Sequence, residues 1–211
     1  MKLIIAAMTS EVEHILKEFP FVQIDKEKNI YKHEHNDVVL ALTGIGKVNA
    51  AFQLSRVLLT YDIDEVYNIG LAGATHHFKQ GQCVLIHQAQ YHDVDVTAFD
   101  YLPGQIPGCP AFFKTDSNLL KKGEDILKID KAPLFTGDCF MTKPQEKEMV
   151  FDMEGAALYH VCYMMKKPII SIKVISDIIA TSDHIKSYES FERHQGGVLL
   201  LDVFKKMIKE E

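Results

Sequence analysis

The features that the sequence lacks exclude several classes of protein. No apolar run approaches the ~20 residues that a membrane-spanning helix requires. The N-terminal stretch MKLIIAAM is apolar but short, and acidic residues follow it at once, so we expect a core strand there and not a signal peptide. There is no CxxC pair, because the cysteines are widely separated at Cys83, Cys109, Cys139 and Cys162. Such thiols are typical of a reducing compartment and predict a cytoplasmic protein.

Clusters of positive charge are also absent. The formal net charge is −6, and the lysines occur as scattered pairs and not as a stripe. Nucleic-acid-binding surfaces need clustered Lys and Arg, so we expect no nucleic-acid partner, and the lack of a long apolar run predicts no membrane association. No linker, repeat or low-complexity segment interrupts the chain, so residues 1–211 are predicted to form a single domain.

The sequence does contain a regular alternation of strand-like and helix-like segments. Short apolar runs bounded by turn residues predict strands, and apolar residues at helical spacing predict helices. The expected strands are 2–7, 29–35, 37–43, 65–70, 83–91, 132–136 and 169–175. The expected helices are 10–18, 47–60, 117–128, 154–166 and one long helix over 187–209. This alternation predicts a three-layer α/β/α domain.

The same patterns predict several local details. Ser10 is expected to cap the first helix, with Glu13 completing a capping box. His33 and His35 are expected to be plain surface histidines and not metal ligands, because no further ligands accompany them. The irregular stretch 92–116 is long for a loop in a compact domain, and such loops are usually functional. The apolar face of helix 47–60 is predicted to comprise Val48, Ala51, Phe52, Ser55, Leu58 and Leu59.

Three acidic residues stand at the ends of predicted strands or the start of a helix. Glu11 follows the first strand, Asp177 follows strand 169–175, and Glu154 begins helix 154–166. Ligands of open α/β folds bind beyond the carboxyl ends of the strands, so these acids fall where a site would form. Each acid could instead cap a helix or complement its dipole without any catalytic role.

Seven sequence segments occur in an order that resembles a known family. They are AAMTSEVE, GIGKVNAA, NIGLAGA, the block from Tyr91 to Thr115, TGDCF, DMEGAALYHVC and ISDIIATSDH. Together they resemble the methylthioadenosine/S-adenosylhomocysteine nucleosidase branch of the nucleoside phosphorylase family, from Met1 to about the last helix. GIGKVNAA alone would be weak evidence, whereas the ordered set is specific. The resemblance implies a mixed central β-sheet, a homodimer and hydrolytic release of adenine from 5′-modified adenosines, 5′-deoxyadenosine among them.

The resemblance also assigns roles to particular residues. Asp177 matches the catalytic acid that protonates N7 of the purine, and Glu11 matches the acid that activates water as the nucleophile. Met153 and Glu154 match the pair that binds the ribose. The adenine-binding pair is Phe140 and Met141, and the loop from Phe99 to Pro107 matches the segment that covers the 5′ substituent, partly across the dimer interface. Asp152, Leu71 and Ser176 complete the expected pocket.

These residue types suit the cleavage of an N-glycosidic bond. The bond breaks through an oxocarbenium-like sugar, and adenine leaves poorly as an anion, so an acid must protonate it. Burial at the end of an apolar strand would raise the pKa of Asp177 as that role requires. A carboxylate at Glu11 would orient water and favour the positive sugar, while Glu154 would hold two hydroxyls.

The chain departs from the family pattern at a few positions. Relatives often carry Gly and Ser where this chain has Ala6 and Leu71, so a hydroxyl is missing near the expected site. The segment between Phe140 and Asp152, which in relatives shapes the purine side of the pocket, is shorter than usual.

Two other functions remain open on the sequence alone. One is a phosphorylase on the same fold, and the other is a nucleoside-binding protein with weakened catalysis. Phosphorylases of this family bind phosphate with arginines, but this chain has only Arg56 and Arg193, and neither lies in a strand-end loop. Lys47 is the one cation that those loops offer, although Gly44 and Gly46 could form a small anion nest. GIGKVNAA lacks the Walker spacing, so we expect no cofactor, and no metal is expected either.

Overall fold

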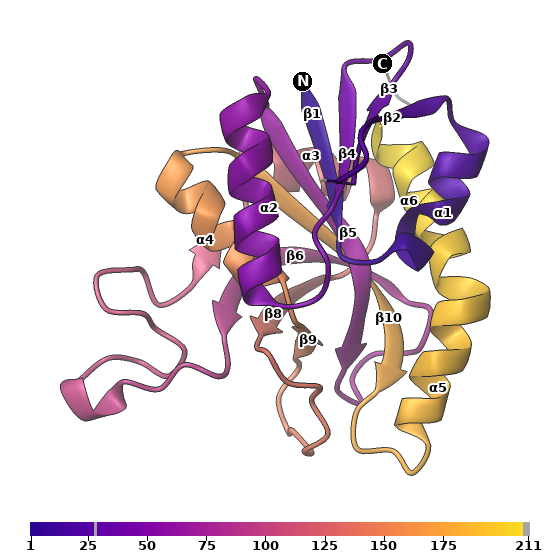
Figure 1. Ribbon diagram of the computed structural model, residues 1–211. Coiled ribbons are helices and arrows are strands. Elements are labelled where there is room, and N and C mark those ends of the chain that lie inside the picture. The colour runs from indigo at the N-terminus through magenta and orange to yellow at the C-terminus, as the bar shows by residue number, and fades with distance from the viewer. Residues whose placement is uncertain (28, 209–211) are drawn as a thin grey trace.

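The computed structural model describes residues 1–27 and 29–208 as an α/β/α sandwich (Figure 1). The strands are β1 (Lys2–Ala6), β2 (Phe21–Asp25), β3 (Ile30–His33), β4 (Val38–Leu42), β5 (Glu65–Ala74), β6 (Cys83–Tyr91), β7 (Phe113–Lys114), β8 (Lys131–Thr136), β9 (Val150–Asp152) and β10 (Ile169–Ile178). The α-helices are α1 (Thr9–Glu18), α2 (Lys47–Thr60), α3 (Ser117–Leu127), α4 (Gly155–Met165), α5 (His184–Phe191) and α6 (Gly197–Ile208). A short 3₁₀ turn covers Thr97–Phe99, and a π-helical turn over Glu192–Gly196 joins α5 to α6.

The central sheet is mixed, as the resemblance implied, and part of it closes on itself. β5 pairs in parallel with β1 and with β10, and antiparallel with β9. β10, β6, β8 and β9 continue the ladder until β9 meets β5 again, so five strands form a ring. The strands β1, β4, β3 and β2 extend the sheet outward from β5. β5 therefore lies at the junction between the closed and the open halves.

Helices cover both faces of the sheet and enclose one apolar core on each side. α2 and α4 pack together on one face, where Leu54, Val57 and Leu158 are buried against the sheet. α1, α3 and α6 cover the other face, with Val12 and Leu200 in that second core. Figure 1 shows α2 and α4 on the left of the sheet and α1, α5 and α6 on its right. Each fully buried side chain of this size contributes about 1.5–3 kcal/mol, so the two cores hold the sheet between them.

The structure corrects several local predictions. Helix 47–60 has the predicted bounds but the wrong face was chosen, because the buried residues are Ala50, Gln53, Leu54, Val57 and Leu58. Val48, Phe52 and Leu59 are exposed. His33 is buried and not on the surface. Its Nδ1 accepts the backbone N–H groups of His35 and Asn36.

The start of α1 also differs from the prediction. Met8 and not Ser10 is the N-cap residue, and the carboxylate that reaches back to the cap N–H is that of Glu11 and not Glu13. The strands β2, β7 and β9 were not predicted, and β5 continues beyond its predicted end to Ala74. The predicted helix 187–209 is interrupted by the π turn. Its last predicted residue lies outside the described part of the chain.

Candidate active site

A pocket opens where β1, β5, β9 and β10 end, at the junction of the two halves of the sheet. It gathers most of the residues expected from the sequence. Its lining comprises Ala7, Met8, Glu11, Ile45, Ala72, Gly73, Cys139, Phe140, Met141, Phe151, Asp152, Met153, Glu154, Ser176, Asp177, Ile179 and Tyr188. Four acidic residues from three distant parts of the sequence therefore meet in one cavity.

Glu11 is held in place by backbone donors at the start of α1. Its Oε2 accepts the N–H groups of Ala7 and Met8, both at 2.9 Å, and its Oε1 accepts the N–H of Leu71 at 2.8 Å. A Cβ at Gly70 would lie 2.8 Å from Oε1, so the absence of a side chain there makes room for the carboxylate. Burial raises the pKa of Glu11, while Lys173 and the three N–H donors oppose the rise. A carboxylate so placed is a stronger base than one in water.

Asp177 also lines the pocket, but in a different environment, in which one carboxylate oxygen has no hydrogen-bond partner among the described residues. Its Oδ1 accepts the hydroxyl of Ser176 at 2.6 Å. Its Oδ2 is buried and has no hydrogen-bond partner among the described residues. Burial raises the pKa of Asp177, and the hydroxyl of Ser176 and the imidazole of His184 oppose this only in part. The unpaired Oδ2 is therefore suited to carry a proton.

Glu154 lies between these two acids at the start of α4. Its Oε1 accepts the N–H of Gly46 at 2.7 Å, and burial together with the neighbouring Asp152 raises its pKa to about 7. Asp152 lines the pocket as expected, but its oxygens are already bonded to Thr136, Gly155 and Lys173. Asp152 is thus placed to support the site and not to bind a ligand directly.

The ammonium group of Lys173 occupies the centre of this acidic cluster. Its Nζ lies 2.9 Å from Oδ2 of Asp152, and both side chains are almost fully buried. Burial disfavours the charged form, but the carboxylates of Asp152, Glu11 and Glu154 prevail and raise the pKa of Lys173. Lys173 faces Gly70 in the β10–β5 register, so the same missing side chain makes room for both Lys173 and Glu11.

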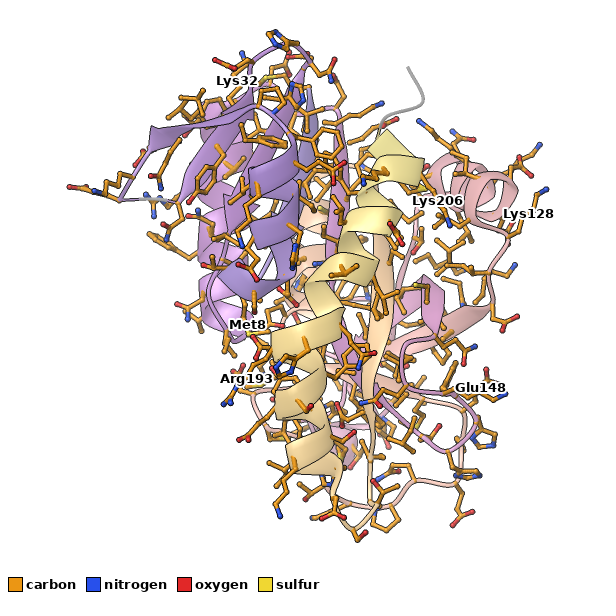
Figure 2. The ribbon with its side chains drawn as sticks, turned by 90° about the vertical axis from the view of Figure 1, so that its right-hand side faces the viewer. Met8, Lys32, Lys128, Glu148, Arg193 and Lys206 are labelled. Carbon is orange, nitrogen blue, oxygen red and sulfur yellow. The ribbon has the colours of Figure 1, made fainter. Side chains whose placement is uncertain are left out.

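Aromatic and sulfur-containing side chains form the remaining wall. The ring of Phe140 lies parallel to that of His184 at 5.6 Å and edge-on to Tyr188 at 5.5 Å. The hydroxyl of Tyr188 approaches Sδ of Met8 at 3.9 Å. Figure 2 shows Met8 beside the helix formed by α5 and α6. A flat aromatic ligand such as a purine fits a wall of this kind.

The glycine turn before α2 was the strongest reason to consider phosphate. Gly44 and Gly46 do have positive φ angles, of 77° and 101°. However, the N–H of Gly46 donates to Glu154, and the N–H of Lys47 donates to Oδ1 of Asp138 at 2.8 Å. Carboxylates of the chain itself therefore occupy the nest.

The cations that the sequence analysis considered as phosphate ligands lie away from the pocket. Lys47 pairs with Asp93 at 2.5 Å. Arg56 lies over the ring of Phe52 on α2, and Arg193 is exposed on the π turn, as Figure 2 shows. Lys173 is a further cation that the sequence patterns did not single out, although a lysine inside the apolar strand IISIKVIS was a signal that could have found it.

Three predicted pocket residues do not line the cavity of the single chain. Leu71 contributes its backbone N–H to Glu11, while its side chain packs in the core near Gly196. Phe99 and Pro107 are exposed in the segment after β6, which projects away from the body at the left of Figure 1. Their predicted role across a dimer interface stays a prediction. Tyr188, His184 and Met8 are pocket or wall residues that the sequence analysis missed.

Comparison with known proteins shows the family to which the chain belongs. The family model described as the phosphorylase superfamily matches residues 2–200, which defines the class of protein. A 5′-methylthioadenosine/S-adenosylhomocysteine nucleosidase of Bacillus subtilis is 37% identical over 194 residues, covering 84% of this chain and 83% of the relative. The chain belongs to this nucleosidase family of the superfamily.

Solved structures agree in fold over the full length. A Borrelia burgdorferi chain, provisionally described as the same nucleosidase and bound to adenine, is 31% identical with a TM-score of 0.89 and 99% coverage of both chains. The Neisseria meningitidis nucleosidase, in complex with methylthio-immucillin-A, is 26% identical with a TM-score of 0.91, covering 100% of this chain and 99% of that one. Over residues 1–27 and 29–208, we find no helix that combines the length and apolar character needed to cross a membrane.

Proposed function

We propose that the protein hydrolyses the N-glycosidic bond of 5′-methylthioadenosine and S-adenosylhomocysteine, releasing adenine and the 5-substituted ribose. The observation that carries the proposal is the pairing of two unlike acids in one pocket. Asp177 presents a buried oxygen without a partner in the described chain, and Glu11 presents a carboxylate fixed by three backbone donors. The names of the relatives supply the substrate class.

The acid side of the reaction falls to Asp177. Its raised pKa favours a protonated carboxyl that donates to N7 as the bond to the sugar breaks. Ser176 donates to Oδ1 and so leaves Oδ2 as the oxygen available to carry the proton. Phe140 and Met141 line the pocket on the side where the purine would lie.

The water side of the reaction falls to Glu11. Its fixed carboxylate orients a water molecule toward the anomeric carbon and accepts a proton from it as the positive charge on the sugar develops. Glu154, together with Met153, lines the pocket where the ribose hydroxyls would lie. The negative charge of the Glu11 carboxylate stabilises the oxocarbenium-like sugar.

Water is a better nucleophile than phosphate for this pocket. A phosphate dianion needs free N–H donors or uncompensated cations. The nest at Gly46 already binds two carboxylates, and Lys173 lies among three acidic side chains. An incoming dianion would be repelled by Glu11.

The test is product analysis with and without phosphate. The purified protein is incubated with methylthioadenosine in phosphate-free buffer, and base and sugar are identified by mass spectrometry. We expect adenine and free methylthioribose at a rate that added phosphate does not change. Release that depends on phosphate, with the sugar leaving as its 1-phosphate, would contradict the proposal. Binding without release would point to a protein that only binds nucleosides.

We also propose that the protein is a homodimer formed through α2, α4 and the segment after β6. Val48, Phe52 and Leu59 on α2 are 78%, 62% and 79% exposed, and Met164 on α4 is 70% exposed. An apolar face of this kind on neighbouring helices is typical of a subunit interface. Phe52→Asp should yield a monomer in sedimentation, whereas Val22→Asp, at an exposed apolar residue of β2, should not. Wild-type protein that sediments as a monomer at assay concentration would refute the interface.

Two further proposals concern the cover of the 5′ substituent, which depends on the dimer, and the cellular compartment, which depends on the cysteines. Phe99 and Pro107 do not reach the pocket of their own chain, so we propose that they cover the 5′ substituent in the partner's pocket. The four free cysteines favour a reducing compartment, and we propose the cytoplasm.

A further inference from the structure

The four cysteines differ strongly in how accessible their sulfur atoms are. Cys162 is buried in α4, and burial raises the pKa of its thiol to about 12. Burial also raises the pKa of the half-buried Cys83. Sγ of the half-buried Cys109 is engaged with Nε2 of His160 at 3.3 Å. Cys139 is the one exposed thiol of the four, and access is the first requirement for a thiol to react.

The position of Cys139 connects it with ligand binding. Cys139 lines the same pocket as Asp177, whose buried Oδ2 has no partner within residues 1–27 and 29–208. That buried and unpaired oxygen identifies the cavity as a ligand site independently of the cysteine. The thiol therefore stands on the wall of a ligand site and not on an unrelated surface.

The residues on either side of Cys139 are both tethered. The Asp138 carboxylate accepts the N–H of Lys47, and its own N–H donates to Asp93 at 2.9 Å. Phe140 stacks on His184. Because α2 holds one neighbour and α5 the other, the backbone at Cys139 has little freedom to carry an added group away from the pocket.

We propose that Cys139 is a reversible modification site for small thiol-reactive electrophiles, such as low-molecular-weight disulfides and thiosulfonates, and that its modification closes the base end of the pocket. With a methanethiosulfonate, the Cys139 thiolate attacks the sulfenyl sulfur. A new disulfide bond forms to the methylthio group, the bond between that sulfur and the sulfonyl sulfur breaks, and methanesulfinate leaves. The thiol proton passes to solvent. A dithiol reverses the step by exchange.

The assignment of the base end rests on the proposed function, so the site of modification is measured separately from activity. The full chain is treated with limiting N-ethylmaleimide, which adds the thiol across its carbon–carbon double bond, and peptides are mapped by mass spectrometry. Cys139 should be labelled at least about tenfold faster than the other three cysteines, because it is the exposed one. Saturating adenine should slow the labelling of Cys139 while leaving that of Cys109 unchanged.

Activity supplies the second measurement, with each variant compared with its own untreated sample. Methyl methanethiosulfonate should inactivate the wild type and Cys109→Ala alike, and dithiothreitol should restore both. Cys139→Ala should resist the reagent. Equal sensitivity of Cys139→Ala, or preferential labelling of another cysteine, would overturn the proposal. Labelling of Cys139 that adenine does not slow would overturn its placement at the base end. Labelling that adenine slows in a protein that releases no adenine from methylthioadenosine would refute the proposed reaction and leave the modification site standing.

Discussion

Removal of the buried ammonium group by Lys173→Met should destabilise the protein strongly. Methionine keeps the length and the apolar stem of the side chain, so the change removes charge with little loss of volume. Nζ of Lys173 lies 2.9 Å from Asp152 in a site where the two side chains are 3% and 2% exposed. Breaking such a buried pair costs about 3–5 kcal/mol, because the remaining carboxylate loses its counter-charge without regaining water.

Urea unfolding measures this loss directly. Lys131→Met is the matched control, since Lys131 also lies on a strand, β8, and pairs with Glu124. The side chains of this second pair are 48% and 37% exposed. An exposed pair contributes at most about 1 kcal/mol. Lys173→Arg, which keeps the charge, should recover most of the stability. Equal losses in Lys173→Met and Lys131→Met would refute this account of the acidic cluster.

The pH dependence of the free energy of unfolding and of kcat/KM gives a readout that a merely structural lysine would not change. Lys173 opposes the rise in the pKa of Glu11 that burial causes, so Lys173→Met should raise that pKa further. A carboxyl whose folded pKa exceeds its unfolded value loses stabilising free energy as the pH rises through the folded pKa. The stability deficit of Lys173→Met should therefore grow as the pH rises above 4.5, the ordinary pKa of a glutamate side chain. The acidic limb of kcat/KM should move to higher pH, and an unmoved limb would contradict the role of Lys173.

Three further predictions concern the acids and their surroundings. Asp177→Asn should lower kcat by about 100- to 10,000-fold with the fold intact, because Asn cannot donate the proton to N7, and wild-type release of adenine would refute the role. Glu11→Gln should lose most activity in steady-state assays yet still bind a transition-state mimic in calorimetry, and normal hydrolysis would reduce Glu11 to a helix-capping residue. Gly73→Ala should lower kcat more than it lowers the free energy of unfolding, since its Cβ would lie 3.1 Å from Oδ2 of Asp177.

The acids could be predicted from sequence because each stands at the end or the start of an element whose type is evident. Strands end at residues that the apolar pattern marks, and parallel strands bring those ends together. Asp177 and Glu11 were found in this way, and the family resemblance supplied their roles. Glu154 was found at the start of its helix.

Lys173 was missed because its environment is entirely tertiary. A lysine in a strand is usually at an edge or in solvent. Here its partners come from β9, α1 and the start of α4, and the space for it comes from Gly70 on the neighbouring strand. The apolar residues around Lys173 indicate that it is buried, but nothing local to the sequence identifies these partners.

The wrong prediction of the buried face of α2 has a different cause. Apolar residues occupy two faces of this helix, one with Leu54 and Val57 and one with Val48, Phe52 and Leu59. The periodicity of apolar residues indicates both of these faces, but it does not indicate which of them packs against the sheet. The exposed one is the face that we propose as the subunit interface, so the error arose where a helix serves two contacts.

The hydrogen bond from the Leu71 amide to Glu11 has a consequence for spectroscopy. This N–H points at the carboxylate whose charge governs the proposed reaction. An amide proton bound to an ionised carboxylate is held more strongly than one bound to the neutral acid. Its NMR resonance should therefore titrate with Glu11, and the Leu71 amide becomes a reporter of that ionisation in the resting protein, with no substrate present.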